Sequence, residues 1–241
     1  MHRTLEDVQV GATPAVSGPI RVYFVLAALL LTSTTTKVGV YVVAIAIFSV
    51  LSTLAVGRTY FRLLGYPLSF LVPSLLIIAV FTGDAPVFQF WLIGVSERGS
   101  KVAVTTGLRA VASLSVVLFL ALTTTVPELV AALDEIHLPD PIVEFLLLVY
   151  RGIQVLVEQA VRLHTAARLR GGFESRRTLF MTTKLVGSSL LLSSIDRAEA
   201  FENAMESRNY AGRMPVPEFE NGGHALVAIV LVVLVATRWL A

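Results

Sequence analysis

The chain has 241 residues, of which 55% are hydrophobic and 15% charged, and its formal net charge is +2 at pH 7. Soluble domains carry about 25% charged residues, so this composition predicts a membrane protein, and the small net charge argues against a nucleic-acid-binding protein. The sequence has no cysteine, which excludes structural disulfides and thiolate metal sites.

Five apolar runs follow a polar N-terminus, residues 1–18, which lacks the features of a signal peptide and which we expect to be retained. A bilayer core needs about 20 mostly apolar residues per helix, with about 17 as a lower limit. The runs are residues 19–32, which is short, 38–56, 66–81, 102–122 and 225–240. The third contains Pro73, which neighbouring helices tolerate, and the threonine-rich residues 32–36 predict a tight loop. We therefore expect an all-α integral membrane protein with about five transmembrane helices plus long cytoplasmic or interfacial coupling helices.

A region of different character separates the fourth and fifth runs. Asp140, followed by proline, predicts the N-cap of a helix that ends at Arg170, because two glycines follow this arginine. A second helix is expected over residues 178–208, since Asn209 tolerates the left-handed conformation that stops a helix. The chain is thereby divided into a four-span membrane region (1–122), a coupling-helix region (123–222) and a C-terminal transmembrane helix (223–241).

The positive charges predict the orientation. Ten of the 19 Lys and Arg residues lie within residues 150–215, and the positive-inside rule places this region in the cytoplasm. Four preceding spans then place the N-terminus in the cytoplasm as well. The loop with Arg58 and Arg62 falls on the cytoplasmic side, in agreement with the rule, whereas Arg98 and Lys101 fall outside and disagree with it.

Two further apolar stretches, residues 142–156 and 185–195, leave an alternative open. Each is shorter than about 17 residues. In the first, Glu144, Arg151 and Glu158 recur every seven residues along one stripe, which is typical of a helix that lies at the membrane interface or under protein. We prefer an interfacial or buried position for both stretches over a spanning one.

Motifs for catalysis and metal binding are not found in the sequence. The histidines, which we interpret as ordinary surface or loop residues because they do not stand at metal-ligand spacing, are His2, His137, His164 and His224. There is no GxxxxGKS/T phosphate loop and no GxSxG elbow, so we do not expect the chain to be an ATPase or another enzyme. The spans contain no carboxylate, which argues against a proton- or sodium-coupled carrier.

The two predicted helices between the spans both end on an arginine, Arg170 and Arg208. A cation at a helix C-terminus is favoured by about 0.3–1 kcal/mol, which would explain either arginine as a simple cap. It does not explain why small residues, arginine, a turn residue and an aromatic residue recur in this order at both places. Because a guanidinium pairs in two-point fashion with a carboxylate in a partner's groove, we favour a docking role.

Several short motifs accompany these helix ends between residues 120 and 212. They are Leu122-Thr123-Thr124-Thr125, Pro127-Glu128-Leu129, Ala132-Leu133, Leu138-Pro139, residues 144–151, Asp196-Arg197-Ala198-Glu199 and Ala204-Met205-Glu206-Ser207-Arg208. Together they resemble the transmembrane T component of energy-coupling factor (ECF) transporters, most closely the CbiQ family of cobalt transporters. The first 120 residues match that family only as a hydrophobic pattern.

The family's signatures are two short Ala-Arg-Gly motifs at the ends of coupling helices. The corresponding segments here are Leu169-Arg170-Gly171 and Ser207-Arg208-Asn209. The arginine is kept in both segments, whereas leucine and serine replace the alanines, and asparagine replaces the second glycine. Asparagine is the mildest replacement for glycine at a left-handed cap.

The resemblance implies that these six residues dock two ATP-binding cassette ATPase subunits, one at each helix end. ATP and Mg²⁺ would be bound by those subunits, and this chain would carry no cofactor and no metal. The helices would pass the ATPase movement to a separate substrate-binding membrane subunit similar to CbiM. The residues expected to support the coupling helices are Arg151, Arg197, Glu199 and Glu206.

Two other classes of function stay open. A stand-alone secondary transporter or channel would need a polar path through the spans, which offer little beyond serine and threonine. A membrane-embedded enzyme would need acids or histidines at one membrane face, and we interpret its candidates as the solvated turn before a helix. These candidates are Asp134, Glu135, His137 and Asp140.

Overall fold

The computed structural model describes residues 9, 11–12, 15–82, 88–90, 93–95, 97–210, 217 and 219–240. The chain divides into two compact units. The first consists of Met1–Ala132 with Pro217–Ala241, and the second of Leu133–Val216. The domain boundaries expected at residues 122 and 222 stay predictions.

Helices build almost all of the described first unit. They are α2 (Ile20–Thr34), α3 (Val38–Val56), α4 (Thr59–Phe81), α5 (Glu97–Thr123), the first part of α6 (Val126–Glu135) and α9 (His224–Leu240). Two short strands, β1 (Phe88–Phe90) and β2 (Ile93–Val95), pair antiparallel between α4 and α5. The fold class is that of an all-α integral membrane protein, as the composition predicts.

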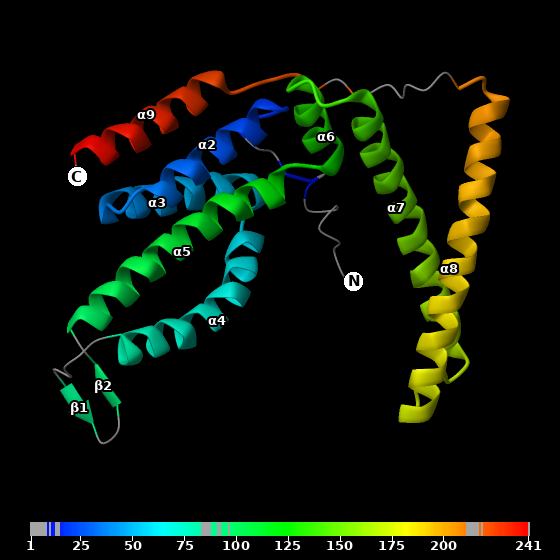
Figure 1. The fold of residues 1–241 in the computed structure, drawn as a ribbon, viewed down its shortest axis with the longest axis horizontal. Coiled ribbons are helices and arrows are strands. Elements are labelled where there is room, and N and C mark those ends of the chain that lie inside the picture. Colours follow the sequence, from blue (N-terminus) through cyan, green and yellow to red (C-terminus); the bar gives the residue numbers. More distant parts are fainter. Residues whose placement is uncertain are drawn as a thin grey trace. The chain divides into compact units, whose positions relative to one another are not determined.

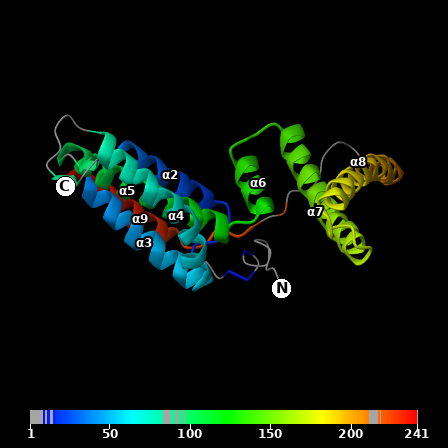
Figure 2. The ribbon, with the colours of Figure 1, turned by 90° about the horizontal axis from the view of Figure 1, so that it is seen from below.

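The core of the first unit forms where α5 packs along α2, α3 and α4. Phe24, Phe48 and Phe119, one from each of α2, α3 and α5, are fully buried and form a cluster with ring centroids 5.5–6.5 Å apart. The last helix, α9, lies against α2 and α3 and adds Leu234 to this core (Figures 1 and 2). Helices α2 and α9, which are far apart in the sequence, therefore belong to one helix bundle.

The threonine-rich segment differs from the prediction. Helix α2 continues through Thr34, so the loop comprises residues 35–37 and not 32–36. The hydroxyl groups of Thr32 and Thr34 donate to carbonyl oxygens four residues earlier in the helix. Serine and threonine can satisfy their hydroxyls in this way inside membrane helices, so a run of them does not by itself end a helix.

Helix α4 contains two prolines, Pro67 and Pro73, and is visibly bent (Figure 1). Proline removes a backbone hydrogen bond and so bends a helix that neighbouring helices hold together. The helix begins seven residues earlier than expected, at Thr59. Tyr60 anchors this early start, because its buried hydroxyl hydrogen-bonds Ser49 of α3 and Ser115 of α5.

Four helices within the described residues are long and apolar enough to cross a membrane: Val38–Val56, Thr59–Phe81, Arg98–Thr123 and Arg176–Ser207. The first three belong to the five predicted spans. The other two predicted spans correspond to α2 and α9, which are apolar but have only 15 and 17 residues. The fourth candidate contains the stretch 185–195, which we expected to be interfacial or buried. It qualifies by length because polar residues extend it at both ends.

The second unit consists of the end of α6 and two long helices, α7 (Asp140–Leu169) and α8 (Arg176–Ser207). These two helices run antiparallel from a short turn and diverge with distance from it (Figure 1). The residue before α7 is Pro139, with Asp140 as the first helical residue, so the expected N-cap is shifted by one position. Ser175 starts α8 with a capping box, in which it and Thr178 exchange hydrogen bonds.

Candidate functional site

The end of α7 has the geometry of a Schellman motif. Arg170 directly follows the last helical residue, and Gly171 adopts a left-handed φ of +71°. The Gly172 N–H donates to the Ala167 carbonyl at 2.9 Å, and the Gly171 N–H donates to the Arg168 carbonyl at 3.1 Å. These are the two hydrogen bonds that define the motif.

The end of α8 repeats this geometry. Arg208 directly follows the last helical residue, and Asn209 is left-handed with a φ of +53°. The Tyr210 N–H donates to the Met205 carbonyl at 3.1 Å, and the Asn209 N–H donates to the Glu206 carbonyl at 3.0 Å. The backbone dihedral angles of the two arginines also agree, with φ and ψ of −91° and 11° for Arg170 and −94° and 12° for Arg208.

The two helix ends expose similar sets of residues. The side chains of Leu169, Arg170, Ser207, Arg208 and Asn209 are exposed. Arg170 and Arg208 lie at opposite ends of α8, whose 32 residues extend for about 48 Å at 1.5 Å per residue. A single groove in a partner protein cannot receive both arginines at this separation.

Two of the expected supporting residues connect α7 with α8. The Arg197 Nε donates to the Gln159 Oε1 at 3.1 Å, and the Arg151 guanidinium lies 5.9 Å from the centroid of the Phe201 ring. Between them is a cavity of about 540 Å³ within the second unit. Its lining includes a glycine and three alanines, Gly152, Ala198, Ala200 and Ala204.

The other two expected supports, Glu199 and Glu206, are exposed on α8. Within the described residues, neither forms an ion pair.

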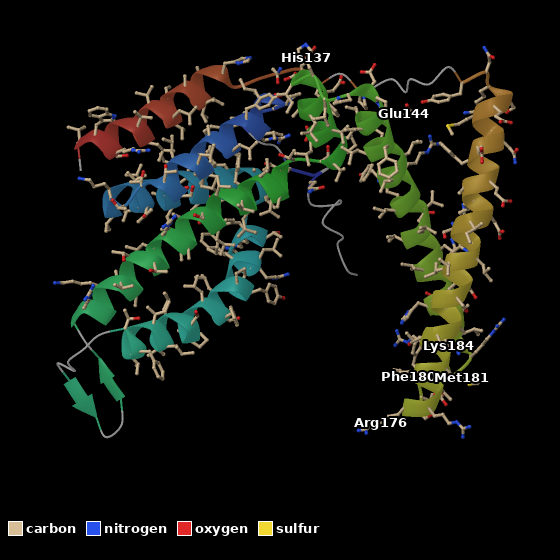
Figure 3. The ribbon with its side chains drawn as sticks, in the orientation of Figure 1. His137, Glu144, Arg176, Phe180, Met181 and Lys184 are labelled. Carbon is tan, nitrogen blue, oxygen red and sulfur yellow. The ribbon has the colours of Figure 1, made fainter. Side chains whose placement is uncertain are left out.

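The first two turns of α8 add a surface that the sequence analysis did not include. Figure 3 shows Arg176, Phe180, Met181 and Lys184 there, near the turn between α7 and α8. The Phe180 and Met181 side chains are 79% and 74% exposed. An exposed phenylalanine and methionine beside two cations form a mixed apolar and basic patch, which is typical of a protein-contact surface. The adjacent phenylalanine and methionine in the first turns of the predicted helix, flanked by basic residues, were the available signal in the sequence.

A buried ion pair in the first unit was also missed. Arg21 of α2 is 1% exposed, and its Nη2 lies 2.7 Å from the Glu128 Oε2 of α6. Charged residues within membrane helices face the protein interior and pair with one another. The arginine stands out in the apolar run 19–32, but no local pattern predicts a partner 107 positions away.

The residues considered for a membrane-embedded enzyme lie around the connection from α6 to α7. Asp134 and Glu135 end α6, and Asp140 begins α7. His137 lies between them with a left-handed φ of 61° (Figure 3). In the part of the chain that the structure describes, no group of three or more His, Asp or Glu side chains is placed to hold a metal ion.

The fold and the two helix ends define a multi-pass all-α membrane protein with a long helical hairpin. The family model described as "Cobalt transport protein", CbiQ, matches residues 16–217. The chain therefore belongs to the CbiQ family of cobalt transport proteins and is a membrane component of a transporter. The match includes both arginine-ended helices and most of the first unit.

Curated relatives agree with this family. A fused cobalt transport protein, CbiMQ, of Methanocorpusculum labreanum is 28% identical over 96% of this chain and 40% of its own length. The cobalt transport protein CbiQ of Rhodobacter capsulatus is 30% identical over 72% of this chain and 69% of its own length. The energy-coupling factor transporter transmembrane protein EcfT of Thermanaerovibrio acidaminovorans is 32% identical over 64% of this chain and 62% of its own length. The chain thus spans less than half of the fused relative and about two thirds of the others.

Proposed function

We propose that this chain is the transmembrane coupling subunit of an ATP-driven importer of the ECF type, with cobalt ion as the transported substrate. Its two arginine-ended helices each dock one ATP-binding cassette ATPase subunit. ATP and Mg²⁺ bind to those subunits, and ATP hydrolysis takes place there. The chain itself is a transport subunit and not an enzyme.

The observation that carries the proposal is the repeated Schellman geometry at Arg170 and Arg208. Each motif stops the helix at the arginine, because the residue that follows is left-handed. The arginine side chain therefore projects from an exposed helix end. The separation of the two ends by the length of α8 supports two docking sites, one for each of two ATPase subunits. A cap that only stabilised its own helix would need no such repetition.

The substrate-binding partner follows from the relatives. One relative joins CbiM and CbiQ in a single fused protein, which supports a separate CbiM-like membrane subunit as the partner of this chain. The α7–α8 hairpin offers an apolar surface for it. The large hydrophobic side chains exposed along α7 recur three or four positions apart, as on one face of a helix, and are Ile142, Phe145, Val149, Ile153, Val157 and Val161.

The orientation is part of the proposal. The ATPase subunits of such an importer are cytoplasmic, so both helix ends and the N-terminus lie on the cytoplasmic side. The ten Lys and Arg residues of the region 150–215 support this orientation.

Co-purification tests the docking. The wild-type chain and an Arg170→Glu, Arg208→Glu double variant are purified with the cognate ATPase and the substrate-binding subunit present. We expect the wild type to retain the ATPase and the double variant to release it, because two acids replace the charges that the grooves receive. Chromatographic behaviour of the free chain shows whether the double variant is folded.

Each result has a distinct meaning. If wild type and variant retain the ATPase equally, the arginines are caps and the docking contact lies elsewhere. If neither retains it, the assignment to an ATP-driven importer fails, and a stand-alone transporter becomes the hypothesis to test by uptake into liposomes that contain this chain alone.

A further inference from the structure

The short helix α6 links the helices of the first unit to the coupling hairpin, and side chains of α2 hold it at both of its ends. It has ten residues, and isolated helices shorter than about 12–15 residues are marginal in water. Its stability and its direction therefore depend on contacts with the rest of the first unit.

Glu128 stabilises the first turn of α6. Its Oε2 accepts a hydrogen bond from the Thr125 N–H at 2.9 Å, which is the glutamate half of a capping box. The same oxygen receives the Nη2 of Arg21 at 2.7 Å. Arg21 thus acts on α6 through the residue that starts this helix.

Tyr23 holds the other end of α6. Its hydroxyl donates to the carbonyl oxygen of Ala132. Ala132 is among the last four residues of the helix. The carbonyl groups of these residues have no N–H partner within the helix. The start of α2 is fixed in turn, because the side chain of Asn221 accepts the Ile20 N–H at 3.0 Å. We call Arg21, Tyr23 and Glu128 the α2–α6 clamp.

The ion pair of the clamp is a costly way to gain stability. Arg21 is 1% exposed, and its Nε and Nη1 are buried without a hydrogen-bond partner. Buried ion pairs with unsatisfied donors often contribute less to stability than apolar side chains of similar volume would. A charged hydrogen bond is directional, whereas apolar contact is not. The ion pair therefore restrains the orientation of α6 on α2.

Beyond the clamp, the connection to the hairpin is short. Only residues 136–139 separate α6 from α7. His137 closes α6 with a left-handed turn, in which the Leu138 N–H donates to the Leu133 carbonyl at 3.4 Å. The chain therefore passes from the first unit to the hairpin through α6.

We propose that Arg21, acting through Glu128, is a positioning residue for coupling: it fixes α6 on α2, so that movement of the α7–α8 hairpin is passed to the membrane helices. This inference rests on the proposed function, because it assumes that the hairpin moves with the ATPase cycle. Without the clamp, α6 yields to the hairpin and ATP hydrolysis continues with less transport.

The experiment uses the full complex of this chain with its ATPase and substrate-binding subunits in liposomes. It measures Co²⁺ uptake per ATP hydrolysed for wild type, Arg21→Met, Glu128→Gln and Arg21→Lys. We expect Arg21→Met and Glu128→Gln to lower this ratio about tenfold, the order of effect of mutations along a coupling network, while ATPase retention is unchanged. Glu128→Gln keeps an acceptor for the Thr125 N–H and removes only the charge.

Two variants make the test specific. Arg21→Lys is expected to keep most of the coupling ratio, because the arginine contacts Glu128 through a single nitrogen, which an ammonium group can replace. Arg162→Met is the matched control, since it removes the arginine of an exposed pair with Glu158, whose side chains are 77% and 73% exposed. It is expected to leave the ratio unchanged.

A second measurement needs no partner subunit. Hydrogen exchange of the isolated chain in detergent is expected to be faster in α6 of Arg21→Met and of Tyr23→Phe than in wild type, with α3 and α5 unchanged. If α6 exchanges at the wild-type rate in both variants, there is no clamp and the inference is wrong.

The transport experiment can also contradict the inference. It is wrong if Arg21→Met complexes keep the wild-type ratio of Co²⁺ uptake to ATP hydrolysis, or if uptake and hydrolysis fall in parallel. If the wild-type complex shows no ATP-dependent uptake, the proposed function fails, and the exchange data still decide whether the clamp exists.

Discussion

Arg170 and Arg208 share two structural features, a helix-end position and an exposed side chain. Each terminates its helix, where a cation is favoured by the helix dipole, and each projects from an exposed end. The residue that follows makes this possible, because Gly171 and Asn209 both take up the left-handed conformation. The replacement of the family's second glycine by asparagine thus leaves the helix end intact.

A single-site version of the docking test separates the two ends. Arg170→Glu alone and Arg208→Glu alone are each expected to lower the amount of ATPase that co-purifies with the chain to about half, since each arginine serves one of two grooves. Quantitative gel densitometry of the purified complex measures this ratio. Arg162→Glu, an exposed α7 variant, should retain the wild-type amount. Complete loss from either single variant would contradict independent docking of one ATPase subunit at each arginine.

Gly171 is expected to be required for its left-handed angle. Gly171→Ala should destabilise the α7–α8 turn by about 1–2 kcal/mol, because a side chain is unfavourable at a φ of +71°. The added Cβ would also meet the Glu174 carboxyl carbon at 3.1 Å. Gly187→Ala in α8 is the matched control, with no atom within 4 Å of the new methyl group, and should be neutral or stabilising by up to about 1 kcal/mol. Chemical denaturation followed by circular dichroism compares the two, and equal effects would contradict the strained-cap explanation.

At the scale of single elements, α8 is where sequence and structure differ most. Its apolar middle is too short to span by itself, but the helix that contains it has 32 residues and meets the length and hydropathy of a membrane span. None of the residues of α8 is buried. Such a helix either crosses the bilayer or is covered by partner subunits, and the proposed function requires the second.

Cysteine labelling decides the position of α8, because the chain has no cysteine of its own. In Arg177→Cys and Asn203→Cys, near the two ends of the helix, both thiols are expected to react with a membrane-impermeant maleimide from the cytoplasmic side. Both native side chains are exposed. Reaction of the two positions from opposite sides would show that α8 spans the membrane, and the docking of both helix ends to cytoplasmic ATPases would then be impossible.

At the scale of the whole molecule, the two units divide the proposed work. The first unit is a helix bundle closed by the return of α9 to α2 and α3. The second is a hairpin whose helices bury little surface within the chain: in α7 only Val143 is buried. Because apolar surface of this kind is stabilised by burial, the second unit is expected to be covered by partners in the assembled transporter.

Partner dependence follows from this division. Liposomes that contain the chain alone are expected to take up no Co²⁺ above protein-free liposomes, whereas liposomes with the ATPase and substrate-binding subunits take it up only when ATP is supplied. The isolated chain should also gain thermal stability when the partners bind. Uptake by the chain alone would support the stand-alone transporter instead.

The sequence by itself determined the class of protein, the approximate place of the helices and their arginine ends. Hydrophobic runs, glycine and asparagine stops, and short motifs are local, and local patterns are what helix formation depends on. Both helix ends lie where the residues after Arg170 and Arg208 predicted them.

Only the tertiary structure decided which distant residues meet. The pairing of Arg21 with Glu128 joins positions 107 residues apart, and Tyr60 extends α4 beyond its apolar run through two hydroxyl groups of other helices. The return of α9 to the first bundle is of the same kind. Such contacts depend on how helices pack together, and no periodicity within a single segment carries that information.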